Sequence, residues 1–252
     1  MSEPVFTPND TPYRKIVNLL KSNYTLLVFL KILNPGRRIE ISSIKRELVL
    51  ADSAKDSLLD IGCGDGYWSR YFKKYVSRVV GLEPYEVDLK KAQKYAIANT
   101  EFIYGTAEKM SFKDGAFDKI ASVCVFEHLY NDVEAFKEFH RVLDDNGILL
   151  ATVDSLNSPF ITKKHIERHM DACYCKQLYT TESLTQKLNI AGFKNVKAYY
   201  IMGSRVSVFW EILMEKIGVF AFFFLPIFWP LIMILEGTPK KSGYKIFVKA
   251  SK

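Results

Sequence analysis

The chain has 252 residues, of which 48% are hydrophobic, and a formal net charge of +7 at pH 7. This length suits one domain with an insertion, and the apolar fraction is ample for a core. Four cysteines in a chain of this size exclude a disulfide framework and fit a reducing cytosol, and the acidic, proline-spaced N-terminus is not that of a signal peptide. We therefore expect a cytoplasmic protein.

The N-terminal part predicts helices that precede the core. After a loose arm, apolar residues recur at helical spacing over 13–33. The segment Asn34-Pro35-Gly36 stops this helix, and the pattern over 39–50 indicates a second one. Two placements stay open for these helices: a lid across the open end of a sheet, or a cover over one of its faces.

A glycine-rich turn follows the first predicted strand, at 57–61. This strand holds Asp60 near its end, and Gly62, Gly64 and Gly66 come at alternate positions after it. Glycine lets a ligand lie against the main chain, and the helix behind the turn offers free N–H groups. The spacing is neither the dinucleotide pattern G-x-G-x-x-G nor a P-loop. It still indicates a nucleotide-type ligand at the carboxyl end of the strand.

From residue 57 onward, strand and helix patterns alternate. The predicted strands are 57–61, 78–83, 101–105, 117–122 and 147–153, and the predicted helices are 66–75, 85–98 and 132–142. Such alternation favours a parallel sheet with helices on both faces.

A polar, irregular segment follows Asp154. It contains residues of the kinds that bind zinc, namely His165, His169, Cys173 and Cys175. Their spacing matches no zinc module that we can name, so we expect no metal site. We expect instead a mobile lid on the substrate side, with histidines that face solvent or the substrate. A helix at 181–190 and strands at 194–202 and 244–250 come next.

The most unusual stretch is 217–235, which contains no charged residue and follows the mostly apolar segment 206–214. It is long enough to cross a bilayer. However, one crossing would separate the strands before and after it, and Pro226 and Pro230 interrupt a straight helix. We therefore expect 206–235 to re-enter a membrane or to lie in its surface plane. A buried insertion or a dimer interface is the alternative reading.

Positive charge is concentrated in 37–46 and in 236–252, which carries five lysines against one glutamate. Such clusters suit nucleic acid or an anionic membrane surface. Neither cluster is interleaved with aromatic residues in the manner of a nucleic-acid-binding surface, so we expect no nucleic-acid partner.

Five motifs in order resemble those of class I S-adenosylmethionine-dependent methyltransferases of the type 11-like group. They are the turn at 58–66, Glu83, Gly105-Thr106-Ala107-Glu108, the strand Phe117-Asp118 with Phe126-Glu127-His128-Leu129, and the passage 138–147. The likeness covers 55–202 and resumes at 243–251. It implies an α/β, Rossmann-like sheet of seven strands, mostly parallel with the last strand antiparallel, N-terminal helices, and a hydrophobic helical insertion between strands six and seven.

The resemblance also implies S-adenosyl-L-methionine as cofactor and S-adenosyl-L-homocysteine as product. The matching cofactor-binding positions are Asp60, Gly62, Gly64, Glu83, Ala107, Glu108 and Val123. Asp60 would lie near the ammonium group of the cofactor, and the two oxygens of Glu83 suit the vicinal ribose hydroxyls. Many members have aspartate where Thr106 stands, so that contact with the adenine falls to Thr106 or Glu108.

His128 follows the fourth strand, near the place of an acceptor, and is the candidate catalytic base; an orienting or structural role is the alternative. We expect a methyltransferase acting on a lipid, isoprenoid or lipid-linked acceptor, peripheral or monotopic on the cytoplasmic membrane face. The alternatives are a soluble acceptor with a dimerising insertion, or a non-catalytic cofactor-binding scaffold. The acceptor atom and the oligomeric state stay open.

The expected parts of the chain are an N-terminal arm and helical lid or flank in 1–55, a cofactor-binding core in 56–202, a hydrophobic insertion in 203–240 and a last core strand in 241–252.

Overall fold

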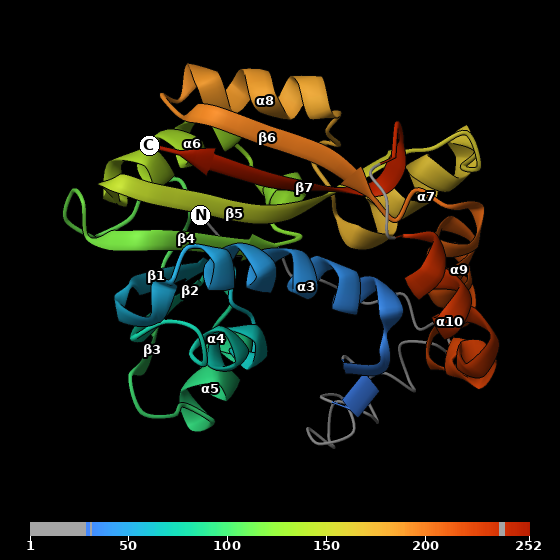
Figure 1. Ribbon diagram of the computed structural model, residues 1–252, viewed down its shortest axis with the longest axis horizontal. Coiled ribbons are helices and arrows are strands. Elements are labelled where there is room, and N and C mark those ends of the chain that lie inside the picture. The colour runs from blue at the N-terminus through green and yellow to red at the C-terminus, as the bar shows by residue number, and fades with distance from the viewer. Residues whose placement is uncertain (1–28, 31, 237–239) are drawn as a thin grey trace, which may run out of the picture.

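A computed structural model describes residues 29–30, 32–236 and 240–252 of the chain (Figure 1). The arm and most of the helix expected over 13–33 lie outside these residues. A seven-stranded sheet forms the centre of the molecule. Its strands are β1 Ser57–Ile61, β2 Arg78–Glu83, β3 Thr100–Tyr104, β4 Phe117–Val123, β5 Leu143–Asn157, β6 Lys194–Ile201 and β7 Gly243–Ser251.

The strand order is β3-β2-β1-β4-β5-β7-β6. Strand β7 runs antiparallel to both of its neighbours, β5 and β6, whereas the other pairs are parallel. This confirms the expected Rossmann-like sheet with an antiparallel last strand. The first and last residues of the strands agree with the predicted bounds to within a few residues, except that β5 is longer than predicted at both ends. It pairs with β7 as far as Asn157 opposite Gly243, a partner that the local sequence does not reveal.

The register brings the carboxyl ends of several strands together. Ile61, the last residue of β1, lies opposite Leu82 of β2 and Ser122 of β4. The glycine turn that follows β1 therefore lies between the ends of β2 and β4, at the edge where parallel sheets bind ligands.

Helices cover both faces of the sheet (Figure 1). Their bounds are α3 Pro35–Leu50, α4 Tyr67–Phe72, α5 Glu86–Lys94, α6 Asp132–Val142, α7 Lys163–Cys173, α8 Thr181–Ile190, α9 Arg205–Ile217 and α10 Leu225–Leu235. On one face, α6 and α8 bury Phe139 and Leu188 against Leu149. On the other, α3 and α4 bury Leu48 and Phe72 in a second core cluster. The helices expected at 66–75 and 85–98 are both shorter than predicted.

The first described long helix, α3, covers one face of the sheet, as one of the two expected placements requires. Ile44 and Leu48 are fully buried in the core cluster of that face. The helix begins at Pro35, earlier than the expected residue 39. Asn34 is its N-cap, and the Asn34 side chain accepts a hydrogen bond from the Gly36 N–H at 2.9 Å. The segment that was expected to stop one helix therefore also starts the next.

The apolar insertion folds into a helical hairpin of α9, a 3-10 helix at Gly218–Phe224, and α10. Phe209 of α9 stacks on Phe228 of α10 with ring centroids 5.7 Å apart. The chain turns at Gly218, whose φ is +58°, and not at the prolines. Pro230 lies inside α10, so the expectation that it would interrupt the helix is wrong. The reversal needs a positive φ, which glycine alone adopts without strain.

Both ends of this hairpin meet the sheet at its ligand-binding edge. Ile201, the last residue of β6, lies opposite Lys245, near the start of β7. Asp154, near the end of β5, also lies opposite Lys245. The hairpin therefore leaves the sheet at the same edge as the glycine turn (Figure 1).

Candidate active site

The glycine turn has the backbone shape that its sequence predicts. Gly62 and Gly64 have φ values of +66° and +55°. A Cβ atom at Gly62 would come within 2.5 Å of Val125 Cγ2, whereas one at Gly64 would meet nothing within 4 Å. Gly62 is thus required by packing, and Gly64 borders open space in which a ligand can lie against the main chain.

Asp60 is buried at the end of β1, with 3% of its surface exposed. The Ser69 hydroxyl, which comes from α4, donates a hydrogen bond to Asp60 Oδ2 at 2.5 Å. Burial raises the pKa of Asp60 to about 7, and the nearby Glu83 carboxylate adds to the rise. This carboxyl therefore titrates near neutral pH, where a cationic ligand would favour its charged form.

Glu83 ends β2 and closes the glycine turn. Its Oε2 accepts a hydrogen bond from the Gly64 N–H at 2.7 Å, and its Oε1 accepts one from the Tyr85 N–H at 3.0 Å. Burial raises its pKa. The structure thus brings together two predicted site residues that are 19 positions apart in sequence. Each oxygen of the carboxylate keeps a further lone pair that can accept from a ligand hydroxyl.

The remaining predicted cofactor positions follow the ends of β3 and β4. Ala107 is buried in the core, and Glu108 Oε1 accepts a hydrogen bond from the Tyr130 N–H at 3.3 Å. Val123, the last residue of β4, is partly buried against the α3 side of the sheet. After β4, Val125 lies against the glycine turn at Gly62.

His128 lies in a 3-10 helix, Phe126–His128, directly after β4. Burial lowers its pKa, although a hydrogen bond with the Tyr174 backbone works in the opposite direction. The imidazole is therefore neutral at pH 7, which is the form that accepts a proton.

A buried ionic cluster lies on the hairpin side of these residues, and the sequence patterns did not predict it. We define it as Glu40, Cys124, Glu127, Asp154, His169, Glu215 and Lys245. At its centre, Lys245 Nζ is 2.6 Å from Glu40 Oε1 and 3.0 Å from Asp154 Oδ1. Lys245 also donates a hydrogen bond to Cys124 Sγ at 3.1 Å. Three elements, α3, β5 and β7, therefore meet through one ammonium group.

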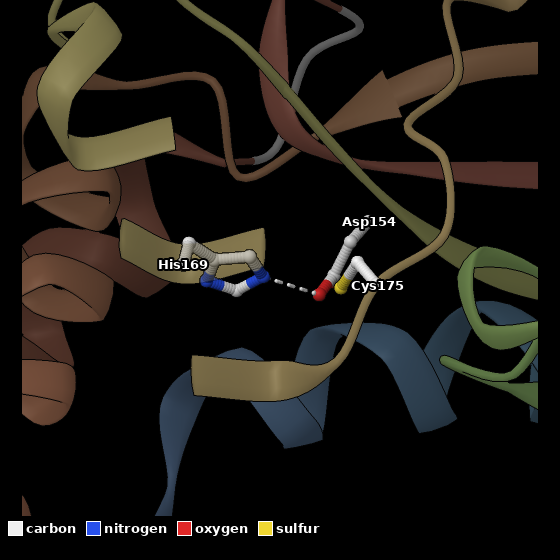
Figure 2. A group of neighbouring side chains, drawn as sticks. All are labelled: Asp154, His169 and Cys175. Atoms are coloured by element: carbon white, nitrogen blue, oxygen red, sulfur yellow. Dashed lines mark hydrogen bonds and ion pairs between the residues drawn. The ribbon is translucent and has the colours of Figure 1, made fainter. Parts of the chain in front are cut away.

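His169 links this cluster to the hairpin. Its Nε2 is 3.1 Å from Asp154 Oδ2 (Figure 2), and its Nδ1 is 2.6 Å from Glu215 Oε1 on α9. Burial alone would lower the pKa of His169, but the hydrogen bond to Asp154 and its other partners raise it well above its usual range. Burial would raise the pKa of Asp154, yet the charge of Lys245 holds it far below its usual range.

The segment expected as a mobile lid contains a regular helix, α7, with buried histidines. Only 7% of His165 and 5% of His169 is exposed, so these histidines do not face solvent, which was one of the two expected orientations. Thr162 caps the helix by accepting a hydrogen bond from the His165 N–H. The two histidines lie four residues apart, on the face of α7 that packs against Glu215 and Tyr244.

One sequence signal could have revealed this cluster. Lys245 interrupts an apolar strand, and Asp154 ends another, so each places a charge at a position that the sheet should bury. A charge in such a position needs a partner of opposite sign. The pairing of β5 with β7 supplies that partner, and only the strand order shows it.

A family model described as a methyltransferase domain matches residues 59–151. An uncharacterised methyltransferase of Bacillus subtilis is 27% identical over 183 residues, which are 69% of this chain and 67% of that protein. A mitochondrial ubiquinone biosynthesis O-methyltransferase of Arabidopsis thaliana is 29% identical over 102 residues, which are 38% of this chain and 32% of that protein.

Among solved structures, a phosphoethanolamine N-methyltransferase of Haemonchus contortus, bound to S-adenosyl-L-methionine, has a TM-score of 0.64 at 18% identity. The match covers 98% of this chain and 61% of that one. At this identity the likeness concerns the fold. The chain thus spans about two thirds of the Bacillus protein and about a third of the Arabidopsis one.

Proposed function

We propose that the chain is a class I S-adenosylmethionine-dependent methyltransferase and that it transfers the methyl group of this cofactor to a lipid or lipid-linked acceptor at a membrane surface. The observation that carries the proposal is the apolar hairpin of α9 and α10, which leaves the sheet at the edge where the cofactor binds. A membrane-held acceptor requires an enzyme whose open edge faces the bilayer.

In this proposal the cofactor lies along the ends of β1, β2, β3 and β4. Its ammonium group pairs with Asp60, and its methionine part passes the open space beside Gly64. Its ribose hydroxyls donate to Glu83, which the hydrogen bond from Gly64 already holds in place. The turn that contains Ala107 and Glu108 flanks the adenine, and the segment from Val123 to Phe126 lies beneath the sulfonium or the adenine edge.

Methyl transfer is an in-line displacement. The acceptor atom forms a bond to the methyl carbon while the bond from this carbon to sulfur breaks, and S-adenosylhomocysteine leaves with the electron pair. The protein contributes alignment and the exclusion of water. A hydroxyl acceptor must also lose a proton, and we assign its acceptance to the neutral ring of His128.

The hairpin exposes many large apolar side chains. They are Phe209, Phe220, Phe223, Phe224, Ile227, Leu231, Met233, Ile234 and Leu235. The run 205–235 is long and apolar enough to cross a membrane by length and composition alone, although its two helices fold back on each other. So many exposed apolar side chains on one hairpin are unfavourable in water, which supports insertion into the interface of a bilayer.

Basic side chains adjoin the hairpin where lipid head groups would lie. A cavity of about 240 Å³ between α7 and α9 is lined in part by Lys164, Arg168 and Lys216, together with Ile212. We call these three cations the basic rim. Cations next to an inserted apolar surface attract anionic head groups, which supports the cytoplasmic membrane face as the site of action.

The name of one relative points in the same direction. The Arabidopsis thaliana protein is a ubiquinone biosynthesis O-methyltransferase. This supports an isoprenoid acceptor as one candidate within the proposed lipid class.

The test replaces exposed apolar residues of the hairpin without touching its interior. In the triple variant Phe220→Ser, Phe223→Ser and Ile234→Ser, we expect unchanged thermal unfolding and cofactor affinity, because all three side chains are at least 61% exposed. Binding to phospholipid vesicles should fall at least tenfold, because each buried apolar side chain contributes about 1.5–3 kcal/mol. A lipid extract is solubilised in detergent and reconstituted into vesicles. The rate of methyl transfer to this extract should fall together with vesicle binding.

The matched control carries Val87→Ser and Ile97→Ser, which are exposed apolar residues near β3 at the opposite end of the sheet. It should bind vesicles like the unchanged protein. Full vesicle binding by the triple variant would contradict the proposal. The proposal would also be contradicted if the unchanged protein were a dimer, the triple variant were a monomer, and the activity on a water-soluble acceptor stayed the same.

A further inference from the structure

Three side chains of the kinds that bind metal ions lie close together at the edge of the buried ionic cluster (Figure 2). A carboxylate oxygen of Asp154, a ring nitrogen of His169 and the sulfur of Cys175 lie within 4.8 Å of one another. Each residue is at most 8% exposed. They come from β5, from α7 and from the loop after α7, so the fold itself assembles the group.

The end of α7 explains why Cys175, and not Cys173, joins this group. Tyr174 adopts a left-handed conformation with φ of +58°, and this turn ends the helix. The Cys175 N–H then donates to the Met170 carbonyl at 3.0 Å, which folds the chain back. As a result Cys175 is buried, whereas Cys173 is exposed.

The second nitrogen of His169 has the partner that a metal-binding histidine needs. Its Nδ1 is 2.6 Å from Glu215 Oε1, so Nδ1 can donate its proton to this carboxylate. A metal ion would then take the place of the proton that Nε2 shares with Asp154 Oδ2. A carboxylate behind a histidine fixes the tautomer and the ring orientation in metal sites.

Glu127 provides an independent indication of a bound cation. It is fully buried, and neither of its carboxylate oxygens has a hydrogen-bond partner among the described residues. A carboxylate oxygen of Glu127 lies within 4.8 Å of ligand atoms of Cys124 and Asp154. A buried acid without a partner is costly, and a cation held in common with Asp154 would satisfy it.

The position of Lys245 decides where such a cation fits. Its ammonium group contacts Asp154 Oδ1 at 3.0 Å and Cys124 Sγ at 3.1 Å, and so occupies the Cys124 side of the carboxylate. Asp154 Oδ2 points instead toward His169. The space between Oδ2, Nε2 and the Cys175 sulfur is therefore the one that a cation can share.

We propose that Asp154, His169 and Cys175 form a binding site for one divalent cation of the zinc class, whose charge also offsets that of the buried Glu127 carboxylate nearby. A thiolate and an imidazole favour zinc over magnesium or calcium, and three protein donors with one open position are a coordination that zinc adopts. The sequence led us to expect no metal, because its histidines and cysteines have no zinc-module spacing. The site takes only two of those four residues and adds Asp154 from β5.

The test uses the purified full chain after removal of metals with a chelator. Cobalt(II), a spectroscopic substitute for zinc, should bind with a stoichiometry of one and give a sulfur-to-cobalt charge-transfer band in the near ultraviolet. Zinc should displace it and raise the temperature of thermal unfolding, because a ligand that binds only the folded state stabilises it.

Variants identify the ligands. Cys175→Ser should abolish the charge-transfer band, whereas Cys173→Ser, the matched control two residues earlier, should retain it. Glu127→Gln should weaken cobalt binding at least tenfold while the band persists. Circular dichroism and cofactor affinity report whether each variant is folded.

Two results would overturn the site. One is no stoichiometric binding of cobalt or zinc by the unchanged protein, a measurement that depends on no variant. The other is a band that persists in Cys175→Ser and disappears in Cys173→Ser. Because cofactor binding is measured separately, loss of the metal site would leave the proposed methyl transfer standing.

Discussion

At the scale of single residues, Asp60 combines two opposing effects. Burial favours its neutral form and raises its pKa to about 7, whereas the proposed contact with the cofactor ammonium needs the ionised form. The Ser69 hydroxyl partly offsets burial by donating to the carboxylate. The pKa of Asp60 is thus close to neutral pH, so a bound cationic ligand can determine whether this carboxyl is ionised.

This predicts a pH dependence of cofactor binding. Below the pKa the free protein carries mostly neutral Asp60, so the cofactor must first displace its proton and the dissociation constant rises. From pH 7 to pH 6 the ionised fraction falls from about one half to about one tenth, which weakens binding roughly fivefold. Isothermal titration calorimetry at several pH values measures this. In Asp60→Asn the cofactor affinity should be lower and should not change between pH 6 and pH 7. If the affinity of this variant depended on pH as strongly as that of the unchanged protein, Asp60 would not be the group that pairs with the cofactor ammonium.

At the scale of elements, the hairpin of α9 and α10 is closed at its base by one carboxylate. Glu236, at the end of α10, accepts from the Ser204 N–H at 2.8 Å and from the Ser207 hydroxyl at 2.6 Å. It also accepts from the Gly203 N–H at 3.2 Å. These bonds satisfy free donors at the start of α9 and hold the two ends of the hairpin together.

We expect Glu236→Ala to loosen the hairpin while the sheet stays folded. Three donors lose a charged acceptor, which should cost about 1–3 kcal/mol. Limited proteolysis within 203–240 should become faster, and cofactor affinity should not change. Glu167→Ala, on the exposed face of α7, is the control. Equal proteolysis rates in both variants would show that Glu236 does not close the hairpin.

The helix α3 contributes both to the core on one face of the sheet and to the ligand-binding edge. Its buried residues Ile44 and Leu48 cover a face of the sheet, while Glu40 near its start pairs with Lys245 at the ligand-binding edge. Arg37, one turn earlier, pairs with Glu40 at 2.8 Å. Packing along the length of the helix therefore fixes the charges at its end.

At the scale of the whole molecule, positive charge and apolar surface lie on the same side. The basic rim of Lys164, Arg168 and Lys216 lines a cavity between α7 and α9, and α9 is part of the apolar hairpin. This arrangement lets charge attraction and apolar insertion act on one bilayer at once.

Changing the basic rim to glutamine should weaken binding to anionic vesicles by about 1 kcal/mol, or about fivefold, for each charge. Binding to neutral vesicles should change little, because the apolar hairpin is intact. Sedimentation with vesicles of defined composition, at low and high salt, measures both. Lys90→Gln with Lys94→Gln, on α5 at the other end of the sheet, is the control. Equal losses on anionic and neutral vesicles would rule out a head-group role.

The sequence alone determined much of the fold, because local patterns report local geometry. Alternating strands and helices predicted a parallel sheet, and the glycines at 62 and 64 predicted the positive φ values that the turn has. Gly64 and Glu83 meet because one βαβ unit brings the ends of β1 and β2 to the same edge of the sheet. Most of the candidate cofactor site is built from such short-range units.

The buried ionic cluster was decided only by tertiary structure. Asp154 and Lys245 are far apart in sequence, and they meet because β7 inserts between β5 and β6. His169 joins them because α7 packs against both the sheet and α9. Periodicity shows which face of an element is apolar, but not which element covers that face. A charge on a buried face therefore has no identifiable partner until the strand order and the helix packing place one beside it.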